Sequence, residues 1–202
     1  LKDLSRYSIN GDIFGALPVP GVVGEALQFD GVKTYSSSPF KITYPFTISV
    51  WANFTGTEDG TVVSLLDSER SDNYFSIRFN ASGNILAEAR NQTGSSIIAS
   101  QDFRNSFVHI VFVCSTSTNR TLYINGQFYG ASTTDITPTN INKILIGRLR
   151  EVSTPVFFEG AIDELRIYNK ALTENEVYAL YAMKTAPAVK NETRQPKYLG
   201  TT

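Results

Sequence analysis

The adjacent acids Asp163 and Glu164 are the first candidates for catalysis, because paired carboxylates carry out glycoside hydrolysis. Retaining glycosidases hold the two carboxyl groups about 5 Å apart, as a Glu-x-Asp-x-Glu pattern on one strand allows. Asp163 and Glu164 are neighbours, and successive strand residues point to opposite faces. Glu159 and Asp163 are four residues apart, with Gly-Ala-Ile between them. We therefore predict no catalytic residues, and we predict that the chain is not an enzyme.

A single histidine and a single cysteine restrict the remaining chemistry. A Ser-His-Asp triad would need His109, which lies in an apolar run with Val111 and Val113. We interpret His109 as a core histidine and Cys114 as a small buried apolar side chain. One Cys with one His excludes the zinc patterns, and one Cys excludes an intrachain disulfide.

Aromatic and charged side chains at alternating positions predict a binding face. In residues 46–54 the alternation turns Trp51 away from the apolar series, and residues 74–80 and 85–91 follow the same rule. Aromatic rings stack on the C–H faces of sugars, while guanidinium and carboxylate groups bind hydroxyls. The predicted glycan-binding residues are Trp51, Tyr74, Arg78, Glu88 and Arg90. The alternative is a solvated face with cross-strand ion pairs and a Trp51 covered by a loop.

Short strands must position these residues, and the Gly, Asn, Ser and Asp residues between the apolar segments indicate where the turns between strands lie. We expect strands at about 26–30, 46–54, 61–67, 74–80, 85–91, 96–100, 107–115, 120–125, 127–131, 143–149 and 157–168. Asn125-Gly126 predicts a type I′ hairpin, and Ala81-Ser-Gly-Asn84 predicts a second hairpin loop. Thr173 and Glu176 form a capping box that starts one helix, predicted over 173–182.

Composition favours one large all-β domain that faces water. The chain has 202 residues, is 42% apolar and carries a net charge of −1, which predicts no nucleic-acid partner. Its longest apolar run, 107–114, is too short to span a bilayer, so no direct membrane insertion is expected. The start at Leu1 suggests a processed product or a fragment. Five Asn-x-Ser/Thr sequons favour an extracellular, cell-surface or virion-surface location: Asn53, Asn80, Asn91, Asn119 and Asn191.

Six segments carry a family resemblance in the same chain order. They are Gly24-Glu-Ala-Leu-Gln-Phe-Asp-Gly31, Phe46-Thr-Ile-Ser-Val-Trp-Ala52, Phe107-Val-His-Ile-Val111, Leu122-Tyr-Ile-Asn-Gly126, Ile144-Leu-Ile-Gly147 and the cassette from Gly160 to Tyr181. Together they resemble the laminin-G-like jelly-roll domains of the concanavalin A-like lectin/glucanase superfamily, although Phe107 replaces the family's Trp. The resemblance implies a two-sheet antiparallel jelly-roll sandwich with one short C-terminal helix and an extended C-terminal tail.

The resemblance also implies a structural Ca²⁺ where the first and last strands meet. Related folds hold this ion with a carboxylate of the late strand and backbone carbonyls of the N-terminal region, and calcium needs six to eight oxygens. Asp163 is the best candidate ligand, and Asp30, Asp12 and Asn10 are the others. The alternative is that Asp163 accepts backbone N–H bonds and closes the sandwich.

Two functions follow for a jelly-roll domain over 1–184 with a tail or linker over 185–202. The first is a non-catalytic extracellular or virion-surface recognition module that binds a glycan or a glycosylated partner. The second is a structural subunit of an extracellular or viral assembly, docked to neighbouring chains through residues 185–202. A glycan-cleaving enzyme is the least favoured, because the carboxylate pair is missing.

Overall fold

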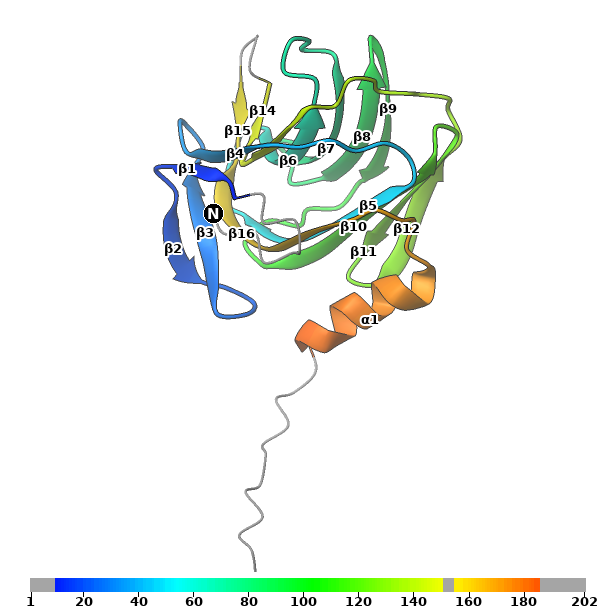
Figure 1. Cartoon of the computed structure of the whole chain (residues 1–202). Helices are drawn as coiled ribbons and strands as arrows, with labels where there is room; N and C mark the ends of the chain where they lie inside the picture. Colours follow the sequence, from blue (N-terminus) through cyan, green and yellow to red (C-terminus); the bar gives the residue numbers. More distant parts are fainter. Residues whose placement is uncertain (1–9, 151–154, 186–202) are drawn as a thin grey trace, which may run out of the picture.

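Two antiparallel sheets stacked face to face form the molecule in this computed structural model, which describes residues 10–150 and 155–185 (Figure 1). Sheet A contains, in spatial order, β1 (Asp12–Phe14), β4 (Tyr35–Pro39), β13 (Lys143–Ile146), β6 (Gly60–Leu66), β7 (Asn73–Phe79), β8 (Ile85–Asn91) and β9 (Thr93–Ala99). Sheet B contains β12 (Gln127–Ser132), β11 (Asn119–Ile124), β10 (Val108–Thr116), β5 (Phe46–Phe54), β16 (Glu159–Tyr168), β3 (Glu25–Asp30) and β2 (Leu17–Pro20). The predicted jelly-roll sandwich is confirmed.

The core lies between the sheets because alternate residues of both face inward. In β5, Phe46, Ile48 and Val50 are fully buried. Phe46 meets Phe75 of β7 edge-on across the sandwich, with ring centroids 4.8 Å apart. Each such buried apolar side chain contributes about 1.5–3 kcal/mol. Cys114 is also fully buried, and burial raises the pKa of its thiol, which confirms the prediction of an inert side chain.

The one helix among the described residues, α1 (Glu174–Thr185), covers the outer face of sheet B (Figure 1). Its predicted capping box is present: Glu176 N–H donates to Thr173 Oγ1 at 3.4 Å, and Thr173 N–H donates to Glu176 Oε2 at 2.9 Å. Val177 is buried against Val111 and Val113 of β10. This apolar contact places α1 against β10.

Both predicted hairpins form, and two predicted strands, 143–149 and 157–168, are divided. Asn125 and Gly126 have φ of 50° and 77°, as a type I′ turn requires. The strand predicted at 143–149 breaks at Gly147, whose φ is 78°. A Cβ there would lie 2.4 Å from the Phe29 ring, so only glycine fits. Beyond the break, β14 (Arg148–Leu149) pairs with β15 (Val156–Phe157).

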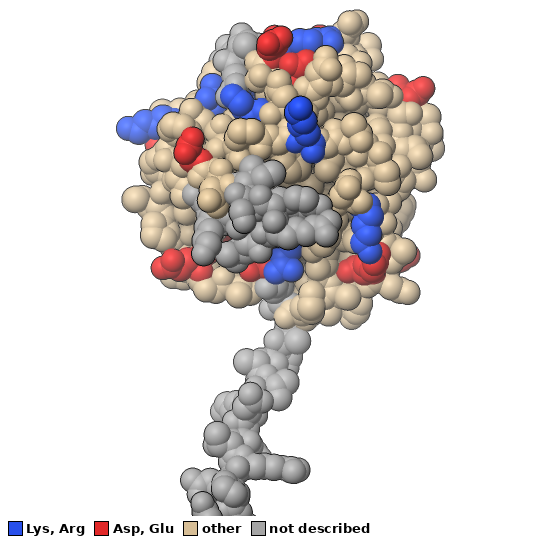
Figure 2. Space-filling model, in the orientation of Figure 1, with Lys and Arg blue, Asp and Glu red and all other residues tan. Residues whose placement is uncertain are grey.

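Three strands were not predicted, because they lack apolar alternation. The edge strands β1 and β2 are largely exposed, and β4 carries three consecutive serines. The predicted tail lies outside the described residues, apart from the last turn of α1, which extends to Thr185. Figure 2 shows basic and acidic side chains interspersed over one face. Within residues 10–150 and 155–185, no helix is long and apolar enough to cross a membrane.

Candidate functional site

Four of the five predicted glycan-binding residues lie together on the outer face of sheet A. Tyr74 and Arg78 come from β7, and Glu88 and Arg90 come from the adjacent β8. The antiparallel register sets Tyr74 opposite Arg90. Because side chains alternate along a strand, these four point away from the core, into which Phe75 is buried.

Glu88 is the centre of this group, which we call the arginine cluster (Tyr74, Arg78, Glu88 and Arg90). Glu88 Oε2 accepts a hydrogen bond from the Tyr74 hydroxyl at 3.2 Å and lies 3.4 Å from Arg78 Nη2. Glu88 Oε1 accepts one from Arg90 Nε at 3.1 Å. Glu88 is only 2% exposed, so an unpaired carboxylate here would be strongly unfavourable. Burial raises the pKa of Tyr74, as does the charge of Glu88, so the phenol keeps the proton that it donates.

The cluster leaves parts of two guanidinium groups accessible. The Arg78 and Arg90 side chains are 23% and 35% exposed, whereas Tyr74 is 3% exposed. Arg78 Nη1 also lies 3.5 Å from Asp59 Oδ2, so both ends of its guanidinium are held. Tyr74 and Glu88 therefore position the two arginines and are too buried to present their own polar groups to a ligand.

Gly94 of β9 is a part of the cluster that the sequence analysis missed. A Cβ at this position would lie 2.6 Å from Glu88 Oε1 and 3.1 Å from Arg90 Nη2. The absent side chain lets Glu88 and Arg90 meet above the sheet. A glycine inside a strand is the signal that could have indicated such a close approach.

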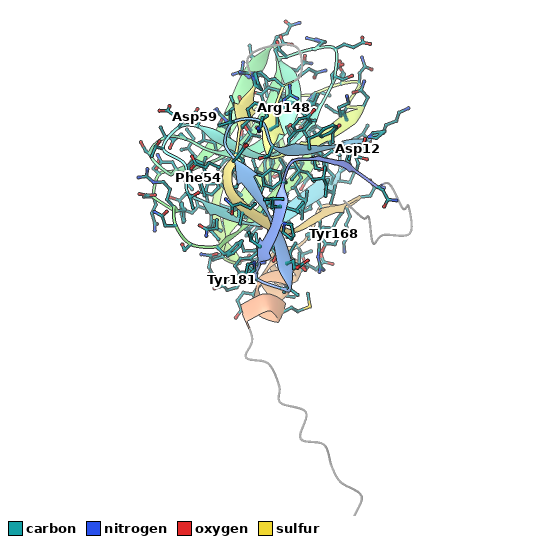
Figure 3. All side chains as sticks on the ribbon, turned by 90° about the vertical axis from the view of Figure 1, so that its left-hand side faces the viewer. Asp12, Phe54, Asp59, Arg148, Tyr168 and Tyr181 are labelled. Carbon is teal, nitrogen blue, oxygen red and sulfur yellow. The ribbon has the colours of Figure 1, made fainter. Side chains whose placement is uncertain are left out.

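The prediction that Trp51 shares this face was wrong. Trp51 lies on β5 in sheet B and is 5% exposed. Its ring stacks on His109 at 5.1 Å and on Tyr181 of α1 at 5.8 Å, so a helix covers it. In Figure 3, Tyr181 lies at α1, and Asp59, which contacts Arg78, lies toward the opposite end of the molecule. Alternation identifies the face within one strand, but not the sheet that the strand joins.

His109 forms a second polar group, beneath α1. Its Nε2 lies 2.9 Å from Ser49 Oγ, its Nδ1 has no partner, and the residue is 1% exposed. Burial lowers the pKa of His109 to about 4. The cavity between His109, Trp51, Glu164 and Leu180 measures about 10 Å³, room for one water at most. A serine–histidine pair that no substrate can reach does not form an accessible nucleophilic site. His109 is buried, as predicted, but outside sheet B rather than between the sheets.

A β-bulge interrupts β16 at Asp163 and Glu164. Asp163 pairs with Trp51 and Arg166 pairs with Ser49, so one extra residue is inserted, and Glu164 has a φ of 49°. Asp163 Oδ2 accepts a hydrogen bond from Val23 N–H at 3.0 Å, and its Oδ1 accepts one from Glu164 N–H at 2.7 Å. Asp163 thus joins the β2–β3 turn to the late strand. The Glu164 side chain is only 18% exposed, and its Oε2 lies 2.6 Å from Arg166 Nη2.

The predicted calcium ligands do not form one site. Asp30 pairs with Glu159, four residues along β16 from Asp163, which separates the two acids by roughly 13 Å. Asp12 lies in sheet A, and Asn10 precedes it. Asp30 Oδ1 caps its own turn: slight burial raises the pKa of Asp30, but N–H bonds from Lys33, Thr34 and Val32 outweigh it and lower the pKa strongly. In the part of the chain that the structure describes, no three His, Cys, Asp or Glu side chains gather. A calcium site built on Asp163 and backbone carbonyls stays a prediction.

A family model agrees with this architecture. Residues 28–178 match the laminin G model of the concanavalin A-like lectin/glucanases superfamily. The chain belongs to this superfamily. The match covers most of the chain, so the resemblance seen in the six sequence segments is confirmed. No curated protein sequence matches the chain.

Several solved structures with the same fold are binding domains of toxins. The binding domain of Paraclostridial Mosquitocidal Protein 1 superposes with a TM-score of 0.73 at 20% identity, over 90% of this chain and 49% of that one. The binding domain of botulinum neurotoxin DC, solved in complex with rat synaptotagmin II, gives 0.73 at 15% identity, over 92% and 49%. A third structure is of botulinum neurotoxin type C, a toxin whose cell entry depends on two ganglioside molecules. It superposes with a TM-score of 0.71 at 17% identity, over 91% of this chain and 48% of that one. This superfamily domain therefore spans about half the length of these chains, and the likeness establishes the fold.

Proposed function

We propose that the chain is a non-catalytic recognition module that binds a glycan or a glycosylated partner on the outer face of sheet A. The observation that carries the proposal is the arginine cluster, in which the buried Glu88 holds Arg78 and Arg90 with their guanidinium groups partly exposed. Guanidinium groups are planar multiple donors that match the closely spaced oxygen acceptors of sugars. Because their positions are set before binding, little side-chain entropy is lost when a ligand arrives.

The burial of Glu88, the acid of the arginine cluster, supports a binding role rather than hydrolysis. A glycosidase needs one carboxyl group that donates a proton and a second that attacks or activates water. In the arginine cluster, Glu88 is buried between two guanidinium groups and the Tyr74 hydroxyl, where no substrate oxygen can reach it. The superfamily fold and the binding roles named for its structural neighbours agree with recognition. An extracellular, cell-surface or virion-surface location is part of the proposal.

Glycan-array binding with charge-preserving variants tests the proposal. Arg78→Lys and Arg90→Lys keep a positive charge beside Glu88 but remove the planar fork. We expect binding to weaken roughly tenfold in each variant, since a hydrogen bond to a charged group contributes about 1.5–3 kcal/mol. Arg104→Lys is the matched control, because Arg104 is ion-paired with Asp102 in the loop before β10. Unchanged binding in both cluster variants would refute this site. If the wild-type protein binds no glycan on the array, the proposal that the ligand is a glycan is refuted.

A further inference from the structure

A pocket of about 350 Å³ opens between two loops far apart in the sequence. Residues 41–44, before β5, form one wall, residues 137–141, before β13, form the other, and Phe75 of β7 completes the lining. Phe75 and Tyr74 are adjacent and point to opposite faces of sheet A. The pocket therefore opens on the core side of sheet A, and the arginine cluster lies on the other side.

Hydrogen bonds hold the walls of this pocket in place. The buried Asn73 makes two bonds with the backbone of Thr139: Nδ2 donates to the carbonyl at 2.6 Å, and Oδ1 accepts from the N–H at 3.0 Å. Asn91 Nδ2 donates to the Thr137 carbonyl at 2.9 Å. On the other wall, the Tyr44 hydroxyl donates to the Ile136 carbonyl at 2.9 Å. A cavity whose walls are fixed in this way is already formed before a ligand arrives, as is usual for small-molecule sites.

The residues that line the pocket indicate which kind of ligand it would bind. Phe75, Pro138 and Ile141 are buried and form an apolar floor. The rim carries threonine hydroxyls and an asparagine amide, and Lys41 is the one charged residue among the described residues that line it. An apolar body would displace water from the floor, and an anionic group would be attracted to the exposed ammonium.

We propose that this pocket binds a small molecule with an apolar, aromatic body and a single carboxylate or sulfonate group. Its volume lies within the range of sites that take drug-sized molecules. Cations are disfavoured, because the described residues of the lining include one lysine and no acid. This second site works independently of the arginine cluster, so failure of one proposal leaves the other intact.

The probe is 8-anilinonaphthalene-1-sulfonate, an aromatic sulfonate whose fluorescence rises in apolar surroundings. We expect one saturable site on the native protein at pH 7 and low salt, with amide NMR shifts confined to residues 41–44, 137–141 and their neighbours. Lys41→Glu should weaken binding roughly tenfold, since it replaces an attraction with a repulsion at short range. Lys33→Glu is the control, because Lys33 is equally exposed but lies in the β3–β4 turn.

The neutral analogue N-phenyl-1-naphthylamine tests the anionic group. It should bind more weakly than the sulfonate to the wild type and respond little to Lys41→Glu. The proposal is overturned if the sulfonate shows no saturable binding, if its shifts map elsewhere, or if Lys41→Glu and Lys33→Glu change its affinity equally. Both lysines are exposed, so both variants should fold, and unchanged melting temperatures would confirm that they do.

Discussion

Lowering the pH should destabilise the protein through His109. The ring is buried beneath α1, stacked on Trp51 and hydrogen-bonded to Ser49. Burial lowers its pKa from 6.5 to about 4 in the folded state, because a charged imidazolium would lose its hydration. Glu164 and Arg166, which line the same cavity, form an ion pair and leave no net charge to offset that loss.

The sign and size of the effect follow from the two pKa values. Above pH 6.5, His109 is neutral in both states, so its titration leaves the free energy of unfolding constant. Between pH 6.5 and 4, only the unfolded state takes up the proton, and stability falls. The folded and unfolded pKa values of His109 differ by about 2.5, and each pKa unit corresponds to about 1.36 kcal/mol. The free energy of unfolding therefore falls by about 3 kcal/mol by pH 4. Roughly two thirds of this loss should be reached by pH 5.

Urea unfolding at intervals from pH 7.5 to 4.5 measures this dependence. His109 is the chain's only histidine, so no other histidine can produce a slope between pH 6.5 and 5. The control is the double variant Ser49→Ala/His109→Phe, which replaces both hydrogen-bond partners with apolar groups. Between pH 6.5 and 5, where that of the wild type falls through His109, its unfolding free energy should stay nearly level. Below pH 5, Asp30 and Glu176, whose pKa values are lowered in the folded state, lower the stability of both proteins. A level wild-type curve, or an equal slope in the double variant, would refute the buried neutral histidine.

Two further predictions concern Trp51 and calcium. Trp51→Ala should lower the unfolding free energy by about 3 kcal/mol, because it removes a buried ring stacked on His109 and Tyr181. Glycan binding by the folded variant should persist, since Trp51 and Arg78 lie in different sheets. Loss of glycan binding would contradict the placement of the binding site on sheet A, away from Trp51. A calcium site on Asp163 predicts that EDTA lowers the melting temperature of the wild type but not of Asp163→Asn. Identical wild-type melting with and without EDTA would reject that site.

Most of the fold could be predicted because its signals are local and periodic. The apolar alternation of residues 46–54 and 85–91 predicted β5 and β8 at the same bounds. Asn125-Gly126 and the capping box of Thr173 and Glu176 formed as their residue types require. By contrast, β1 and β2 were missed, because edge strands need neither apolar alternation nor burial on two faces. β4 lies between β1 and β13 and was missed because its three consecutive serines give it no apolar alternation.

The candidate site could be predicted only in part from the sequence, and the tertiary structure supplied the rest. Alternation placed Tyr74, Arg78, Glu88 and Arg90 on one face, because it needs only adjacent strands joined by a short turn. It did not show that Glu88 would be buried by its own partners, since burial depends on Gly94 in a third strand. Nor did it show the bulge at Glu164, which the pairing of β16 with β5 creates.

The sequence by itself determined most of the strands, the hairpins, the capped helix and the face to which side chains point along a regular strand, because these follow from backbone geometry and residues close together in the chain. Only the tertiary structure decided which sheet each strand joins. Trp51 and Arg78 differ in sheet because β5 pairs with β10 and β16, whereas β7 pairs with β6 and β8. The pocket beside Lys41 has the same origin, since the hydrogen bond from Tyr44 to Ile136 joins residues 92 positions apart. Such long-range pairings carry no periodic signal in the sequence.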